Sequence, residues 1–246
     1  MERPSAVVVG VGAEQGLGAA LCRKFAAEGY HVVVAGRTAA KIDRVVSLIV
    51  EEGGSADAIV TDATSETEVV SLFQNAFAAA SGRAAPDLIV FNAGNNRRID
   101  FRDVSAELFE DFWRVGCFAG FLVGREAVRH LVPLGRGTVI FTGASGSLRG
   151  NAGFAQFAAA KAGLRMVSQS MAREFGPQGI HVAHVIIDGG INGERLKNAQ
   201  PQRFERTGPD GLLDIHAIAD TYWHLHRQER TAWTQELDLR PYGEPY

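Results

Sequence analysis

The chain has 246 residues, of which 46% are hydrophobic and 22% charged, and its formal net charge is −3. These values are typical of a globular protein, and without clustered basic residues we expect no nucleic-acid binding. No window of about 18 apolar residues predicts a membrane span, and two cysteines without motif spacing predict a reducing, cytoplasmic location and no metal site.

Short apolar segments rich in β-branched residues recur along the chain, separated by longer segments in which apolar residues have helical spacing. Continuous apolar runs are typical of strands buried on both faces of a sheet. The helical spacing is clear at Leu17, Leu21 and Phe25. The predicted strands are residues 6–11, 31–36, 56–61, 87–92, 137–143, 180–187 and 233–240.

The alternation of strands and helices predicts an α/β fold: a doubly wound parallel sheet with helices on both faces, arranged as a three-layer sandwich. No interdomain linker interrupts the pattern, so we expect residues 1–246 to form a single domain. Residues 188–213 are the least regular segment, polar and rich in glycine and proline. A long excursion of this kind predicts a substrate lid or binding loop.

A glycine-rich loop follows the first predicted strand and opens the first predicted helix. Gly12, Gly16 and Gly18 have the spacing G-x-x-x-G-x-G. Glycines at this junction let a pyrophosphate approach free backbone N–H groups at a helix N-terminus. The alternative is a tight structural turn without a ligand. Glu14 is unusual beside phosphates, and we expect it either to face solvent or to weaken binding.

Together with two later segments, this loop resembles the short-chain dehydrogenase/reductase family. The matching segments are VGAEQGLG at 11–18, FNAGN at 91–95 and the acidic Asp62 after the third strand. The resemblance covers nearly the whole chain and implies a Rossmann-type domain and an NAD(P)-dependent oxidoreductase. The cofactor would contact Gly12, Gly16, Leu17, Gly18, Arg37, Asp62, Asn92, Ala93, Gly94 and Lys161.

The end of the second predicted strand bears on which dinucleotide would bind. Proteins selective for NAD usually carry an acidic residue there, whereas this chain has Gly36 followed by Arg37. A guanidinium suits a 2′-phosphate, which favours NADP(H) over NAD(H). A solvated arginine is the alternative, and Gln15 in the glycine loop supplies no second cation.

The family usually has four catalytic residues, Asn, Ser, Tyr and Lys, and here only Lys161 matches. Phe157 occupies the position of the tyrosine and has no hydroxyl. Ala144 takes the position of the serine, with Ser145 next to it as a candidate proton donor. Cys117 aligns with the asparagine. The remaining candidates are Ser147, His184 and Tyr222. We expect His184 to be a hydrogen-bonded core residue, and the late helix that carries Tyr222 to help wall a substrate pocket.

Two functions remain open from these residues. The first is an oxidoreductase with an atypical active site that transfers hydride to or from a small organic substrate, its proton coming from Ser145, from water or from no donor. The alternative is a catalytically inactive dinucleotide-binding sensor or structural protein. Arg97, Arg98 and Arg149 after strand ends suggest an acidic ligand, with solvated surface arginines as the alternative. The resemblance implies a homodimer or homotetramer.

Overall fold

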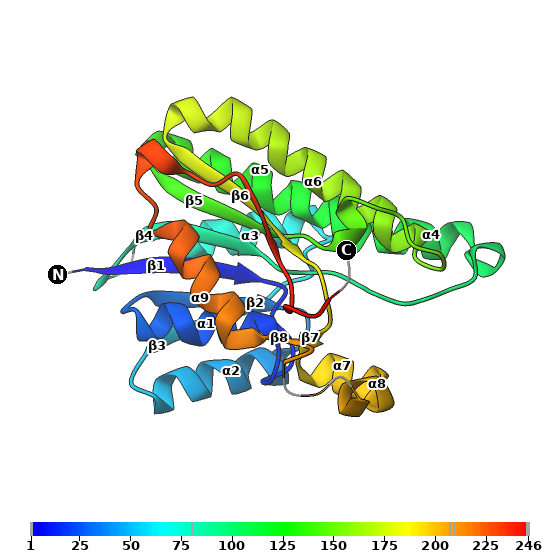
Figure 1. The fold of residues 1–246 in the computed structure, drawn as a ribbon. Coiled ribbons are helices and arrows are strands. Elements are labelled where there is room, and N and C mark those ends of the chain that lie inside the picture. Colours follow the sequence, from blue (N-terminus) through cyan, green and yellow to red (C-terminus); the bar gives the residue numbers. More distant parts are fainter. Residues whose placement is uncertain (1, 80, 207, 209, 245–246) are drawn as a thin grey trace.

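The computed structural model describes residues 2–79, 81–206, 208 and 210–244; residues 1, 80, 207, 209, 245 and 246 lie outside this description. Within the described residues, a seven-stranded parallel sheet has the order β3-β2-β1-β4-β5-β6-β9 (Figure 1). The strand order reverses between β1 and β4, the arrangement of a doubly wound Rossmann-type sheet, so the predicted fold class is confirmed. The strands are β1 (Arg3–Val9), β2 (His31–Gly36), β3 (Ser55–Val60), β4 (Arg83–Phe91), β5 (Gly137–Thr142), β6 (Ile180–Ile187) and β9 (Glu236–Leu239).

Helices cover both faces of this sheet. One buried cluster joins it to α1 (Leu17–Ala27), α2 (Ala39–Glu51) and α9 (Ile215–His226). A second cluster joins the opposite face to α3 (Glu66–Phe77), α5 (Ala119–Leu131) and α6 (Ala155–Phe175). The helix α4 (Ala106–Trp113) runs into α5 through a π-helical turn, Arg114–Phe118. In the described chain, no helix has both the length and the apolar character needed to cross a bilayer.

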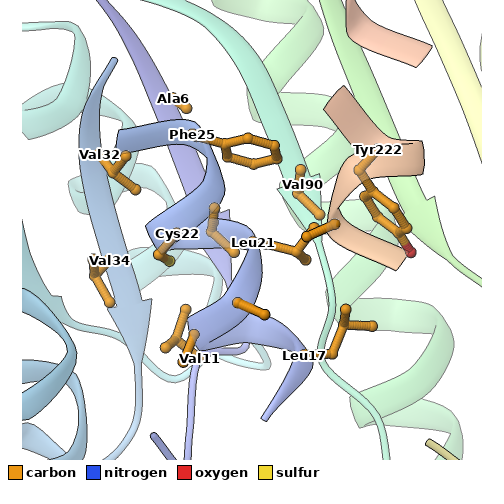
Figure 2. Packing of buried hydrophobic residues seen from close by; sticks show 14 of the residues in the cluster. Ala6, Val11, Leu17, Leu21, Cys22, Phe25, Val32, Val34, Val90 and Tyr222 are labelled. Atoms are coloured by element: carbon orange, nitrogen blue, oxygen red, sulfur yellow. The ribbon is translucent and has the colours of Figure 1, made fainter. Parts of the chain in front are cut away.

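The buried faces explain why the strands read as continuous apolar runs. Along β1, Ala6 and Val8 pack toward α1, whereas Val7 and Val9 pack toward α3 and α5. Both faces of the sheet are therefore buried away from water, which favours apolar side chains at every position of the strand. Figure 2 shows the α1 side of this core, where Leu21 and Phe25 lie among side chains of the sheet and α9.

The described residues of the 188–213 segment form a small excursion at the carboxyl end of the sheet (Figure 1). It contains β7 (Ile191–Asn192), α7 (Glu194–Ala199), α8 (Pro201–Arg206) and the start of β8 (Leu213–Asp214). The two short strands pair in parallel with each other and not with the main sheet. The main-chain N–H of Glu194 donates to the carbonyl oxygen of Gln15 at 2.8 Å, which docks α7 on the glycine loop.

Tyr222 lies within the core, and neither it nor any other residue of its helix α9 lines the cleft described below, which corrects the expectation that this helix walls the substrate pocket. Tyr222 is fully buried on α9, as Figure 2 shows, and is absent from the described walls of the cleft below. Its hydroxyl oxygen lies 2.9 Å from the Thr142 hydroxyl at the end of β5. This hydrogen bond connects α9 to the carboxyl end of β5.

Replacing Tyr222 with phenylalanine is expected to lower the free energy of unfolding by about 0.5–1.5 kcal/mol, the net contribution of one hydrogen bond. Thr142 keeps its bond to Asn92, so no hydroxyl is left wholly unpaired. Urea denaturation followed by circular dichroism measures the change. NADPH binding should stay the same; a large loss of binding would show that the hydroxyl reaches the ligand.

Candidate active site

A cleft of about 540 Å³ opens at the carboxyl ends of the parallel strands, where ligands of doubly wound sheets bind. Its walls come from the loops after β1, β2, β3, β4 and β5, from the start of α6 and from the 188–213 segment. The structure places all the expected cofactor residues on these walls: Gly12, Gly16, Leu17, Gly18, Arg37, Asp62, Asn92, Ala93, Gly94 and Lys161.

The glycine loop leaves room for a ligand where the sequence predicted it. A Cβ at Gly12 would meet no atom within 4 Å, whereas one at Gly18 would lie 3.0 Å from Val11 Cα. Gly18 therefore permits close packing of loop and helix, and Gly12 keeps the cleft open. The first turn of α1 contains no acidic residue, so its free N–H groups face the cleft without a competing carboxylate. Glu14 pairs with Arg44 at 3.1 Å and does not line the described cleft.

Two cations line the far end of the cleft. Arg37 directly follows β2, and Lys41 lies one helical turn further on, in α2. No ion pair engages either side chain within the described residues. Lys41 supplies the second cation that the sequence did not reveal in the glycine loop. Lys41 follows Arg37 by four residues at the start of a helix, and residues with this spacing lie on the same face. This spacing could have predicted Lys41 from the sequence.

Asp62 lies close to Arg37 on the same wall. Its Oδ1 accepts hydrogen bonds from the main-chain N–H and the hydroxyl of Thr64, at 2.9 and 2.8 Å. Burial raises the pKa of Asp62, but the Thr64 bonds and the charge of Arg37 outweigh it and hold that pKa below its usual value. Asp62 is therefore a fixed, ionised acceptor at this end of the cleft.

Lys161 lies at the opposite end and is held by the end of β5. Its side chain is only 5% exposed, and Nζ donates to the Thr142 carbonyl oxygen at 2.7 Å. Burial, and secondarily the positive charge of Arg195, lower the pKa of Lys161 to about 8. Asn92 braces the same corner, because its Oδ1 accepts from the Thr142 hydroxyl at 3.1 Å.

Phe157 precedes Lys161 by one helical turn, and both side chains line the cleft. The Phe154 ring centroid is 6.5 Å from that of Phe157, in an edge-to-face arrangement. A Cβ at Gly146 would come within 2.9 Å of Phe157 Cε1, so the ring fits closely against the loop after β5. The wall next to Lys161 is therefore apolar.

Ser145, expected as a proton donor, is placed differently. It is absent from the described cleft wall, whereas its neighbour Ala144 is present. Ser145 is among the groups that lower the pKa of the Asp188 carboxyl, so its hydroxyl lies beside that carboxylate. Ser147 is also engaged, because its Oγ donates to the Ala144 carbonyl oxygen at 2.6 Å. Within the short turn Ser145–Ser147, the Ser147 hydroxyl is thus satisfied locally.

Cys117 and His184 are likewise outside the described cleft wall. Cys117 packs against Gly163 of α6, and burial raises the pKa of its thiol. The Nδ1 atom of His184 lies 3.0 Å from Glu236 Oε2, and burial lowers the pKa of the imidazole to about 4. His184 is thus the hydrogen-bonded core histidine that the sequence predicted.

The positive charge near the strand ends is smaller than expected, because Arg149 is neutralised. Its guanidinium pairs with the buried Asp188 carboxylate at 2.9 Å, and Arg240 bonds to the same group. Arg97 and Arg98 are exposed on the cleft wall and form no ion pair with the described residues.

Arg195, on α7, is a cleft residue that sequence reasoning missed. Its Nη1 donates to the Gly94 carbonyl oxygen at 2.9 Å, so the 188–213 segment reaches across to the loop after β4. Partial burial, which removes water from around the charge, lowers the pKa of the guanidinium. No periodicity or motif marks this residue, because its contact depends on how the excursion docks.

The Asp188 cluster predicts an acid-sensitive element. Burial raises the pKa of Asp188, but the bonds from Arg149, Ser145 and Arg240 outweigh it, so the folded-state pKa is below the unfolded value. The stabilisation is therefore complete above the usual aspartate pKa and is lost as pH falls through the lower folded value. We expect Asp188→Asn to have a lower melting temperature than the wild type at pH 7. Between pH 5 and pH 3, roughly the range over which aspartates titrate, its melting temperature should fall less steeply with pH than that of the wild type. Melting temperatures that fall equally steeply with pH in the variant and in the wild type would contradict this assignment.

A sequence model described as short chain dehydrogenase matches residues 6–203. The chain belongs to the short-chain dehydrogenase family. This agrees with the glycine loop, the N-A-G segment and Lys161 meeting at one cleft. Among the described residues, no cluster of three or more His, Cys, Asp or Glu side chains could hold a metal ion.

Several relatives show how far the similarity to this short-chain dehydrogenase extends. A solved short-chain dehydrogenase from Rhodopseudomonas palustris is 37% identical, with a TM-score of 0.81, over 97% of this chain and 99% of that one. Gluconate 5-dehydrogenase from Gluconobacter oxydans is 30% identical over 70% of this chain and 66% of its own length. A cyclic-di-GMP-binding biofilm dispersal mediator protein from Escherichia coli is 28% identical over 78% of this chain and 76% of its own length. Relatives with catalytic and with non-catalytic names are thus both similar in sequence to this chain.

Proposed function

We propose that this protein is an NADP(H)-preferring oxidoreductase that moves hydride to or from a small organic substrate without the family's usual tyrosine. The observation that carries the proposal is the cleft, which joins an open glycine loop at one end to the buried Lys161 at the other. A bound dihydronicotinamide would supply the hydride. Membership of the family supports the reaction class.

The residues present fit the cofactor. Gly12 leaves space for a pyrophosphate beside the N-terminus of α1. Arg37 and Lys41 present two cations without an ion-paired carboxylate, which suits the 2′-phosphate of NADP. Asp62 would accept a hydrogen bond from the adenine, and Lys161 would contact the ribose next to the nicotinamide.

The substrate end suggests a ligand with an apolar body and a negative charge. Phe154 and Phe157 form the apolar surface near Lys161. Arg97 and Arg98 line the same cleft and form no ion pair with the part of the chain that the structure describes. A ligand screen by thermal shift with NADPH present should favour carboxylates over their methyl esters. An equal response to both would remove the acidic-substrate hypothesis.

A second function, a dinucleotide sensor or structural protein without turnover, is favoured by one specific observation. The two positions that normally hold hydroxyls at the reacting end, 144 and 157, are alanine and phenylalanine, and both line the cleft. The relative named as a dispersal mediator supports this alternative.

One paired experiment separates the two functions. NADPH binding is measured first, and then carbonyl and alcohol substrates are screened with the wild type and with Phe157→Tyr. Turnover by the wild type supports the oxidoreductase. Binding without turnover in either protein supports the sensor. Activity gained only in Phe157→Tyr would show a competent site that has lost its acid, and no NADPH binding would contradict both functions.

We also propose a homodimer or homotetramer. Phe109, Trp113, Phe121 and Met166 are exposed on α4, α5 and α6, which gives these neighbouring helices apolar outer surfaces. Light scattering should give a mass of two or four chains. A monomer at micromolar concentration would contradict this proposal.

A further inference from the structure

The reacting end of the cleft lacks the hydroxyl acid that a carbonyl reduction ordinarily uses. Ser147 donates to the Ala144 carbonyl oxygen, Ser145 lies beside the Asp188 carboxylate, and neither serine lines the described cleft. The Thr142 hydroxyl is already hydrogen-bonded to both Asn92 and Tyr222. Among the described residues at this end, these engaged groups leave the ammonium of Lys161 as the acid best placed on the wall.

The geometry around Lys161 leaves it free to act. Its Nζ uses one proton in the bond to the Thr142 carbonyl oxygen, and an ammonium has three. A Cβ at Gly94 would lie only 3.3 Å from Nζ, so the absence of a side chain there keeps the ammonium accessible from the cleft. Phe157, one helical turn earlier on α6, lines the same end of the cleft.

We propose that Lys161 is itself the proton donor and acceptor of the reaction, replacing the missing tyrosine. This inference rests on the proposed oxidoreductase function. In the reduction direction, an N–H bond of the ammonium breaks and an O–H bond forms on the substrate carbonyl oxygen. The oxygen uses the electron pair released from the C=O double bond when the carbon accepts the hydride, and Lys161 is left as a neutral amine that regains a proton from water.

The lowered pKa of Lys161 supports this role. A group that donates and accepts protons near neutral pH works best when its pKa is near the working pH, and the pKa of Lys161 is lowered to about 8. Two titratable side chains face it: Arg195 from α7 and His184 from β6. Arg165 and Glu236 pair with each other at 2.7 Å beyond His184. The acidic side chains of α4, Glu107, Glu110 and Asp111, are exposed on the outer surface.

The test begins with a direct titration that needs no substrate. The chain contains only four lysines, Lys24, Lys41, Lys161 and Lys197, so an NMR spectrum of protein labelled at the lysine ε-carbon is simple to assign. We expect one signal with a midpoint near 8, absent from Lys161→Arg and retained in the control Lys24→Arg. Arg195→Gln should move this midpoint upward, because it removes the positive charge that lowers it.

The same titration is repeated with NADPH bound. A midpoint that remains below about 9 supports the inference, and one above about 10, the value of an ordinary lysine, overturns it whether or not a substrate is found. If NADPH does not bind, the proposed function fails, and the lysine titration of the free protein still reports its own result. The two failures are therefore distinguishable.

Kinetics give a second measurement. Single-turnover reduction of trifluoroacetophenone, an activated ketone, should slow as pH rises through the midpoint found by NMR. Lys161→Arg keeps the charge but does not donate near neutral pH, so its rate should fall about 10²–10⁴-fold while NADPH affinity, followed by fluorescence, changes by less than about tenfold. A loss of rate in Lys161→Arg matched by an equal loss of NADPH affinity would overturn the inference.

Discussion

Replacing Arg37 and Lys41 together with alanine is expected to weaken NADPH binding by roughly 30- to 150-fold while NADH binding changes by about threefold or less. A charge-assisted hydrogen bond contributes about 1.5–3 kcal/mol, and the exposure of both cations places the pair near 2–3 kcal/mol in total. NADH lacks the 2′-phosphate, so it loses only the weak general attraction of the two charges. Isothermal titration calorimetry with both dinucleotides measures the difference.

Arg44→Ala is the matched control for this pair. Arg44 lies on the same helix, α2, but pairs with Glu14 and Glu51 and does not line the described cleft. It should leave both affinities close to those of the wild type. If the Arg37 and Lys41 substitutions lower the two affinities equally, or lower neither, the assignment of these cations to a 2′-phosphate is wrong.

Gly36→Ala is expected to destabilise the protein by about 3 kcal/mol and to lower the melting temperature by about 6–12 °C. The added Cβ would overlap the Val11 carbonyl oxygen and lie 2.9 Å from Ile42 Cγ2. Val11 and Ile42 are both buried, so the steric overlap can be relieved only if the glycine loop shifts away from β2. NADPH binding should weaken as well, because Val11 directly precedes Gly12.

Gly12→Ala is the matching control substitution. Its Cβ would meet no atom within 4 Å, so the melting temperature should change by no more than about 2 °C, whereas NADPH affinity falls because the methyl group enters the cleft. Differential scanning calorimetry and NADPH titration of both variants separate folding from binding. Equal melting temperatures for the two variants would contradict the close approach of Gly36 to Val11.

The strands of the fold were predictable because burial on both faces leaves a continuous apolar signature. The predicted strands 31–36 and 180–187 coincide with β2 and β6. The last strand was predicted too long, at 233–240 instead of Glu236–Leu239. There the Thr234 main-chain N–H donates to the Gln228 side chain at 2.8 Å, an irregular turn that composition does not reveal.

The two ends of the cleft differed in how much the sequence could predict. The cofactor end depends on main-chain geometry beside strand ends, and the spacing of Gly12, Gly16 and Gly18 encodes that geometry locally. At the reacting end, the sequence revealed which hydroxyls are missing, but not that Arg149 pairs with Asp188 or that Arg195 crosses to Gly94. Those contacts join segments about 40 and 100 residues apart, so only the folded chain places them together.

The central claim is that the cleft binds a dinucleotide and prefers NADP(H). Calorimetric titration of the wild-type protein with NADPH and with NADH tests this claim most directly. We predict one NADPH bound per chain, at least roughly tenfold more tightly than NADH, as expected for one additional charged contact of about 1.4 kcal/mol or more. Failure of both dinucleotides to bind at millimolar concentration would contradict the account.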